Sequence, residues 1–485
     1  MFVRKVFRPL VLVPVLWVLA LVPAAAQESR AKDGWDMLRN SLTEAGLRVR
    51  AEGSTDTGSG LVVNGVTIAP MRGGALLSLP SLGIEPREAE GYAFIPSQEA
   101  RLELDGAGVV DLEFDGRVLF DRLPEGLRLV PDFARVEARL DGSAGVAGSG
   151  IAAVQMRLDA LEGEITTQEG AQLTLTSTLR AGQVHVMQTW DYGHEHVETS
   201  EIDEVVMGLR VDALDALSGE FDTVAALFER GFALELDFEA AASRSSSRQA
   251  PGGNPLIFDS ASGYSDSNLI LRDGRLEARG SGVDMQMAGN VAGIEGQLAI
   301  DRLEAAFGLP VVATGDLQDF SLSLSVDGMQ ASEESWLLLG ARTFADESAD
   351  MVLEMAAEGR WLVDPAQAEG SNEPIELGAI RLDQLALRLG QAHFEGEGRF
   401  DTDRQAGGLE QAMEMGQGAF TFTLRGGNAL LARLIDEGVL PADQAFLVRM
   451  MLGGMARQVG EDHLESQVTI MPGGQVLVNG MPLPF

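Results

Sequence analysis

The sequence predicts a mainly β protein in which long antiparallel strands meander through two halves, with a few short helices. Two observations carry this prediction. Apolar and polar residues alternate over many segments, which is the pattern of half-buried strands with one wet face. Gly-containing pairs such as Asp115-Gly116, Asp273-Gly274 and Asp327-Gly328 punctuate these segments and are expected to form tight turns.

Residues 1–26 predict a secretory signal peptide. Arg4, Lys5 and Arg8 form a positive region, an apolar stretch follows, and Ala24-Ala25-Ala26 supplies the small residues of a cleavage site. We expect cleavage after Ala26 and export to the periplasm. The alternative is an uncleaved anchor, but the apolar stretch is shorter than the roughly 20 residues that a spanning helix needs. The mature chain is therefore expected to have no transmembrane span.

Charge and composition exclude several classes of function. The 485 residues include 73 acidic and 36 basic side chains, which give a formal net charge of −37. Such a chain is repelled by nucleic acid. The chain has no cysteine, so disulfides, thiolate metal sites and cysteine nucleophiles are excluded together. Stability must therefore come from the hydrophobic core alone.

Residues 27–242 are expected to form an N-terminal β-rich half that begins with one helix. Trp35, Leu38 and Leu42 recur at helical spacing, and this helix should end near Gly46. A second, short helix is expected over 221–230. The apolar residues that alternate with polar ones in this half include Leu102, Leu104, Leu112, Phe114, Leu173, Leu175, Val205, Met207, Leu209, Val211, Leu234, Leu236 and Phe238.

Residues 243–255 (SRSSSRQAPGGNP) are rich in Ser, Gly and Pro and predict a flexible linker or loop. Residues 256–485 are expected to form the C-terminal β-rich half, with a helix that begins near Ser332. The alternating apolar residues of this half include Phe320, Leu322, Leu324, Val326, Leu385, Leu387, Leu389, Phe420, Phe422 and Leu424.

A helical hairpin is expected near residues 428–452. Asn428 can cap its first helix, and Gly438 can end it. Pro441 can open the second helix, which should continue through Met451. Because the hairpin is apolar on several sides, we expect it to be buried.

The last third of the chain resembles a known family. The run GRWLVDPAQ at 359–367 is followed by GGNALLARLIDEGVLPADQAFLVRMMLGGMAR at 426–457 and by a final strand with VLVNGMPL. These runs resemble the uncharacterised alphaproteobacterial family called domain of unknown function 2125. The resemblance covers most of the mature chain and implies an exported, β-rich protein, without an activity or a catalytic motif. A looser, architectural likeness is to AsmA-like envelope proteins, whose long curved sheets are thought to hold lipid tails.

Two motifs suggest chemistry at first sight. Asp56-Thr57-Gly58-Ser59 spells the motif of aspartic proteases, but that chemistry needs two such Asp residues. The other Asp-Thr pairs are Asp222-Thr223 and Asp401-Thr402, and they are followed by Val224 and Asp403 instead of Gly. We therefore interpret residues 56–59 as a polar hairpin turn.

Three histidines cluster in the sequence near residue 190. On a strand, His194, His196 and Glu198 would share one face, and imidazoles with a carboxylate can bind zinc. The competing interpretation is a set of outward-facing polar side chains. The chain has no Gly-x-Ser-x-Gly elbow, no phosphate-binding loop and no His-Glu-x-x-His, so we predict no catalytic residues and no cofactor.

The sequence favours a non-catalytic function in the cell envelope, namely binding of a lipid or another hydrophobic ligand. Many amphipathic strands without a catalytic motif support this hypothesis. Met450, Met451 and Met455 could line an adaptable apolar pocket. The alternatives are an interaction scaffold that binds another envelope protein, and a metal-dependent hydrolase.

Overall fold

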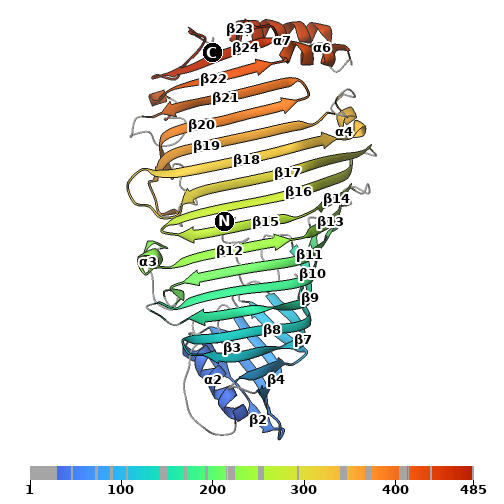
Figure 1. Cartoon of the computed structure of the whole chain (residues 1–485), viewed down its shortest axis with the longest axis vertical. Helices are drawn as coiled ribbons and strands as arrows, with labels where there is room; N and C mark the ends of the chain where they lie inside the picture. The colour runs from blue at the N-terminus through green and yellow to red at the C-terminus, as the bar shows by residue number, and fades with distance from the viewer. Residues whose placement is uncertain are drawn as a thin grey trace. The chain divides into compact units, whose positions relative to one another are not determined.

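Strands make up 71% of the computed structural model, which confirms the prediction of a mainly β, antiparallel meander (Figure 1). The signal peptide predicted over 1–26 lies outside the described residues and stays a prediction. The structure describes residues 30–44, 47–70, 75–87, 91–104, 108–141, 151–168, 170, 172–191, 195–214, 216, 224–249, 256–291, 294–338, 344, 347–365, 374–402, 412, 414–436 and 440–482.

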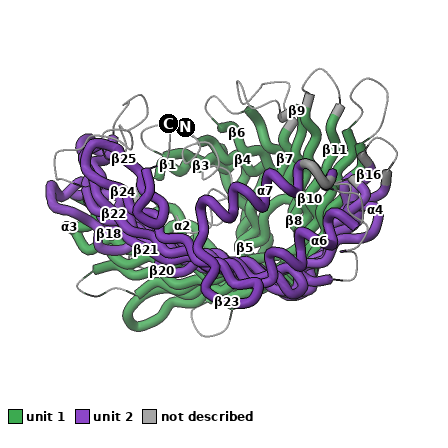
Figure 2. The backbone as a smooth tube through the Cα atoms, turned by 90° about the horizontal axis from the view of Figure 1, so that it is seen from above, with its two compact units in different colours: residues 1–222, 226–257 green, residues 223–225, 258–485 purple. Residues whose placement is uncertain are grey.

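The chain divides into two compact units (Figure 2). The first consists of residues 1–222 and 226–257, and the second of residues 223–225 and 258–485. In each unit most strands pair with their neighbours in sequence, as expected for a meander. Among the described helices of both units, none combines the length and the hydropathy of a membrane span.

The first unit begins with a helix that covers the start of its sheet. Its elements are α2 (Arg30–Glu44), β1 (Leu47–Arg50), β2 (Gly53–Asp56), β3 (Leu61–Pro70), β4 (Ala75–Pro86), β5 (Tyr92–Pro96), β6 (Glu99–Leu104), β7 (Gly108–Leu123), β8 (Gly126–Asp141), β9 (Ile151–Gln168), β10 (Thr174–Asp191), β11 (Glu195–Asp212), α3 (Val224–Glu229), β12 (Ala233–Ala240) and β13 (Ala242–Gln249).

The core of the first unit lies between α2 and the strands that follow it. Trp35 of α2 is buried, as are Ile84 of β4 and Phe120 of β7. An added Cβ at Gly34 would lie 2.6 Å from the ring of Tyr92, so a glycine is what lets α2 approach β5 this closely. The helix predicted from the spacing of Trp35, Leu38 and Leu42 is therefore confirmed, and its apolar side faces the sheet.

Residues 243–249, predicted as linker, instead belong to strand β13. Every residue of β13 pairs with β11, from Ala242 opposite Asp203 to Gln249 opposite His196. The backbone of β11 provides this pairing, so the segment needs no apolar side chains to form a strand. Residues 250–255 lie outside the described part of the chain.

The second unit is built mainly of long strands, with three short helices in its described part. Its elements are β14 (Leu256–Ser262, which starts in the first unit), β15 (Ser265–Arg272), β16 (Arg275–Val291), β17 (Ile294–Pro310), β18 (Gln318–Ala331), α4 (Glu333–Leu338), β19 (Ala349–Trp361), β20 (Ile375–Leu389), β21 (Ala392–Asp401), β22 (Gln417–Arg425), α6 (Gly427–Asp436), α7 (Ala442–Met455), β23 (Arg457–Gly460), β24 (His463–Met471), β25 (Gln475–Val478) and β26 (Met481–Pro482).

Two of the three predicted Gly-containing turns are irregularities inside strands. Asp273-Gly274 does join β15 to β16, as predicted. Asp115-Gly116 instead lies inside β7, and Asp327-Gly328 inside β18, each where the pairing register shifts. Gly116 and Gly328 both have positive φ. A glycine in that conformation accommodates an extra residue without ending the strand. Strands β7 and β18 therefore continue through positions where the sequence predicted a turn.

The prediction of a buried C-terminal hairpin is wrong in its burial, although α6 and α7 lie where it was expected. Helix α7 packs mainly on α6 and β23, and most of its large apolar side chains face solvent. Its sequence is apolar on several sides, but the unit provides a surface for only one of them. The start of α6 also differs, because the amides of Asn428 and Ala429 donate to the carboxylate of Asp462, at 2.7 and 3.0 Å.

Candidate functional site

One face of the second unit is almost entirely apolar from β16 to β24. Directly paired residues of antiparallel strands point to the same side of a sheet, so the register defines the face. Phe307 of β17 lies opposite Leu322 of β18, which lies opposite Met355 of β19. The apolar face, as we use the term, consists of Leu276, Ala278, Leu303, Phe307, Leu309, Phe320, Leu322, Leu324, Val326, Met351, Leu353, Met355, Ala357, Leu377, Ile380, Leu382, Leu385, Leu387, Phe394, Phe400, Phe420, Phe422, Leu424, Leu464, Val468 and Ile470.

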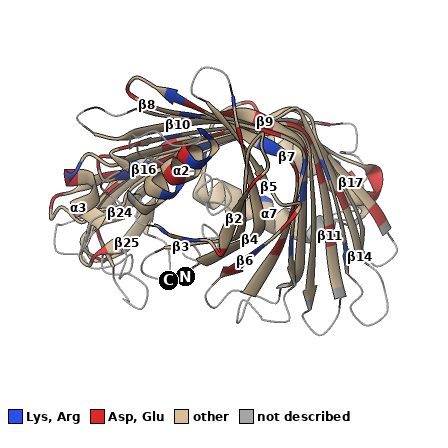
Figure 3. Ribbon diagram, turned by 90° about the horizontal axis from the view of Figure 1, so that it is seen from below, with Lys and Arg blue, Asp and Glu red and all other residues tan. Residues whose placement is uncertain are grey.

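The opposite face of the same strands is polar and carries ion pairs. Arg275 and Glu277 on β16 are 2.8 Å apart, and Arg399 and Asp401 on β21 are 2.7 Å apart. The two members of each pair are two residues apart, so they share the polar side of one strand. In Figure 3 the charged residues form short coloured patches along strands that are otherwise tan. The sheet of this unit is thus amphipathic, with a water-facing side and an apolar side.

The middle of the apolar face is open to solvent within the unit. Phe307, Leu322 and Leu387 keep 42%, 46% and 40% of their surface exposed. Helix α4 contacts β17 near its first residues, where Ser335 donates to the carbonyl of Gln297, while α6 contacts β21 and α7 contacts β23. Phe400, in contrast, is only 2% exposed, because it packs with Ala412 and Ile470. The apolar face therefore has a packed end at β21 to β24 and an uncovered middle.

Three stacked phenylalanines form part of the apolar face between β21 and β22. The rings of Phe394 and Phe422 are 5.8 Å apart with an interplanar angle of 5°, and those of Phe420 and Phe422 are 6.4 Å apart at 11°. An added Cβ at Gly396 would lie only 2.7 Å from Cδ1 of Phe422. Gly396 therefore lets the ring lie against the sheet, and the three rings make a smooth apolar surface.

A polar cluster lies on the first unit where β10, β11 and β13 run side by side. His196 is paired with Trp190 on one side and Gln249 on the other. Its Nε2 lies 2.8 Å from Oγ of Ser247, its Nδ1 lies 3.3 Å from Nε2 of Gln249, and its ring stacks on Trp190 at 4.7 Å. Both ring nitrogens of His196 therefore have protein partners.

Glu198 shares the face of His196, as the strand alternation predicted, and accepts a hydrogen bond from Ser245 at 3.3 Å. His194 lies outside the described residues. Among the residues that the structure describes, no group of three His, Cys, Asp or Glu side chains is arranged to hold a metal. The zinc site at His194 and His196 stays a prediction. The contact between His196 and Ser247 was missed because 51 residues separate them.

The interpretation of residues 56–59 as a hairpin turn is confirmed. They connect β2 to β3, the amide of Gly58 donates to the Asp56 carboxylate at 2.7 Å, and Asp56 is exposed. Asp401, from another Asp-Thr pair, forms an ion pair with Arg399. It also borders a shallow open depression with Gln417 and Thr469. Neither aspartate therefore has the shared-proton partner that an aspartic protease needs.

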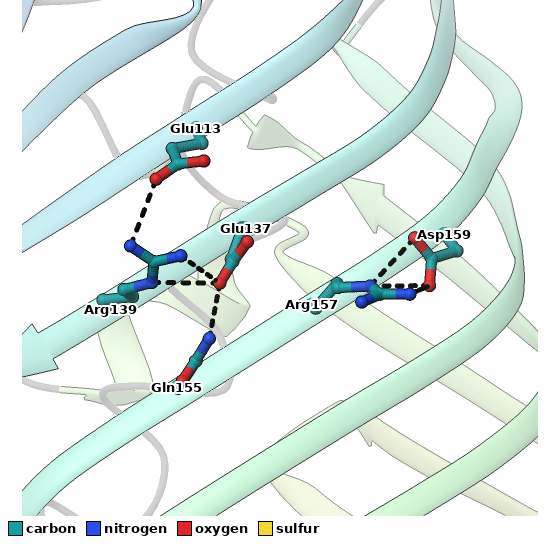
Figure 4. Close-up of polar contacts among 6 residues, drawn as sticks. All are labelled: Glu113, Glu137, Arg139, Gln155, Arg157 and Asp159. Atoms are coloured by element: carbon teal, nitrogen blue, oxygen red, sulfur yellow. Dashed lines mark hydrogen bonds and ion pairs between the residues drawn. The ribbon is translucent and has the colours of Figure 1, made fainter.

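Among the residues that the structure describes, Glu137 is the carboxylate with a clearly shifted pKa, and it belongs to a ladder on the polar side of the first unit (Figure 4). Burial raises the pKa of Glu137, but hydrogen bonds from Arg139 and Gln155 outweigh this effect, so the pKa lies below its ordinary value. Nη2 of Arg139 is 2.7 Å from Glu137, and its Nη1 is 3.2 Å from Glu113. Oε1 of Glu137 thus accepts hydrogen bonds from Arg139 and Gln155, and the cluster of these residues with Glu113 links β7, β8 and β9.

Comparison with known proteins found no matching family model and no matching curated protein. The resemblance described from the sequence therefore stays a prediction. Packing within its own unit does not explain the uncovered middle of the apolar face.

Proposed function

We propose that the protein is a non-catalytic binder of lipid acyl chains or similar apolar ligands, exported to the cell envelope. The observation that supports this proposal is the uncovered middle of the apolar face, with Phe307, Leu322 and Leu387 each at least 40% exposed. Contiguous apolar surface of more than a few hundred Å² is uncommon on soluble proteins and marks a site of interaction.

The chemistry of the face favours an acyl chain over a protein partner. Among the residues that the register places on this side, Gln318 and Ser466 are polar, and Ser466 donates to the carbonyl of Met455. The face therefore offers few side-chain hydrogen bonds. Protein interfaces carry about one hydrogen bond per 100–200 Å², whereas an acyl chain requires none. The face extends over eight strands, and at about 4.8 Å between strands it is roughly 34 Å across.

An open face gives moderate affinity. Burial of a CH₂ group contributes about 0.8 kcal/mol. An acyl chain of about 16 carbons that covers half of its surface against the face gains at most about 6 kcal/mol, which corresponds to a Kd on the order of 10⁻⁵ M. Binding in this range suits a protein that takes up lipid and releases it again.

The test is native mass spectrometry of the full chain purified without detergent. The test variant is Leu322→Glu, which places a charge in the middle of the apolar face. Its matched control is Ser323→Glu, which adds the same charge at the neighbouring residue on the polar face. We expect bound lipid on the wild type and on Ser323→Glu, and at least tenfold less on Leu322→Glu. Wild-type protein without lipid, or equal lipid on both variants, would overturn the proposal.

A further inference from the structure

Helix α7 presents a second apolar surface, outside the sheet. Phe446, Leu447, Met450 and Met451 are 66%, 52%, 57% and 57% exposed. Their spacing of one, three and four residues places them on one side of the helix over two turns. Ala445 of the same helix is buried, so one side of α7 contacts the unit and the other faces outward.

Hydrogen bonds at its C-terminal end hold α7 in place. The carbonyl of Met455 accepts hydrogen bonds from Oγ of Ser466 at 2.7 Å and from Nδ2 of Asn479 at 2.9 Å. Ser466 lies opposite Phe422, which belongs to the apolar face. The end of α7 is therefore fixed to the border of the apolar face, and Figure 1 shows α7 with α6 beside β22 to β24.

The charge around α7 differs from the charge of the rest of the chain. Residues 440–460 carry one acidic side chain, Asp443, and two basic ones, Arg449 and Arg457, whereas the whole chain has about two acids for each base. Arg457 is paired with Glu465 at 3.0 Å. The segment is thus close to neutral, whereas the chain as a whole is acidic and is repelled by anionic headgroups. A zwitterionic bilayer is therefore the lipid surface that fits α7.

The size and composition of this surface fit a lipid bilayer better than a second protein. At about 200 Å² for each large side chain, the four exposed residues present roughly 450 Å². A stable protein interface needs about 800 Å² on each partner, with a polar rim. A bilayer sets no such minimum, because each apolar side chain that enters the acyl region contributes separately.

We propose that α7 docks on the surface of a zwitterionic lipid bilayer, with Phe446, Leu447, Met450 and Met451 inserted among the acyl chains. Docking places the border of the apolar face at the bilayer surface. An acyl chain can then pass from the bilayer to the apolar face with less exposure to water. The proposal that α7 docks is supported by α7 alone. The role of this docking in lipid transfer rests on the proposed function.

The test is flotation of the full chain with phosphatidylcholine vesicles. We expect the wild type to float, Leu447→Ser to bind about tenfold more weakly, and Phe446→Ser/Met450→Ser to stay with the unbound fraction. The matched control is Leu337→Ser, which removes a solvent-exposed leucine from helix α4 and should float like the wild type. Phosphatidylglycerol vesicles should capture less wild-type protein at low salt, because the chain is acidic.

The outcomes separate the two proposals. Wild-type protein that stays unbound, or a double variant that floats like the wild type, overturns docking by α7. Leu322→Glu leaves α7 unchanged and should still float, although we expect it to have lost its lipid. Flotation of wild-type protein that was purified without bound lipid would overturn the proposed function and leave the docking intact.

Discussion

Two phenylalanines of the apolar face should differ sharply in their contribution to stability. Phe307 is 42% exposed in the middle of the face, and Phe400 is 2% exposed at its packed end. Both side chains are removed by substitution with alanine. The comparison keeps the residue type, the face and the unit constant, so that burial is the main difference between the two sites.

The magnitudes follow from that difference. Removal of a buried phenylalanine costs about 3–5 kcal/mol, because transfer free energy is lost and a cavity remains among the neighbours. We expect this cost for Phe400→Ala, since Ala412 and Ile470 close around the ring. At position 307 only about half of the transfer free energy of the side chain is lost, because the ring is half exposed, and no enclosed cavity is left. Phe307→Ala should therefore cost about 1–2 kcal/mol.

The assay is urea unfolding of the delipidated full chain, followed by far-ultraviolet circular dichroism, with midpoints compared at an unchanged slope. Hydrogen exchange at β17 and β21 assigns each loss to the second unit. Equal costs for the two variants would refute the reasoning, because they would show that Phe307 is covered in solution and that the middle of the apolar face belongs to the core.

Three further predictions concern the polar contacts. Glu137→Gln should lower the free energy of unfolding by about 1–3 kcal/mol, against less than about 1 kcal/mol for the exposed control Glu304→Gln. Because folding lowers the pKa of Glu137, its contribution to the free energy of unfolding is present above the ordinary carboxyl pKa. This contribution is lost as the pH falls through the lowered pKa of the folded state. Urea titrations at several pH values should therefore show a weaker acid dependence for Glu137→Gln. Asp462→Ala should cost about 1–2 kcal/mol and speed amide exchange in the first turn of α6. Ser247→Ala should leave lipid binding unchanged, and a fluorophosphonate probe should not label Ser247, because Nδ1 of His196 faces Gln249 rather than a carboxylate; specific labelling would indicate a hydrolase.

Strict alternation in the sequence was enough to predict the strands and their amphipathic character. It did not predict the extent of the apolar face. Leu382 and Leu385 are three residues apart and both belong to the face, because the register shifts between them. A period of two assigns such a pair to opposite sides. Local pattern therefore identified each strand, whereas the bulges that align the strands into one face depend on pairing between strands.

The remaining differences have the same origin in long-range contacts. The sequence shows that many residues of α7 are apolar. It does not show whether another surface covers them. The Ser-rich segment 243–249 became strand β13 through pairing with β11. That pairing also brings Ser247 to His196, and no local signal in the sequence anticipates this contact.

The most direct test of the account is photocrosslinking at two neighbouring positions of β18 in the full chain. A photoreactive phenylalanine replaces Leu322 on the apolar face or Ser323 on the polar face, and the protein is irradiated in cells before purification. The account predicts a lipid adduct at position 322 and none at position 323. An adduct to a protein at position 322, or equal lipid adducts at both positions, would contradict the claim that the apolar face binds lipid.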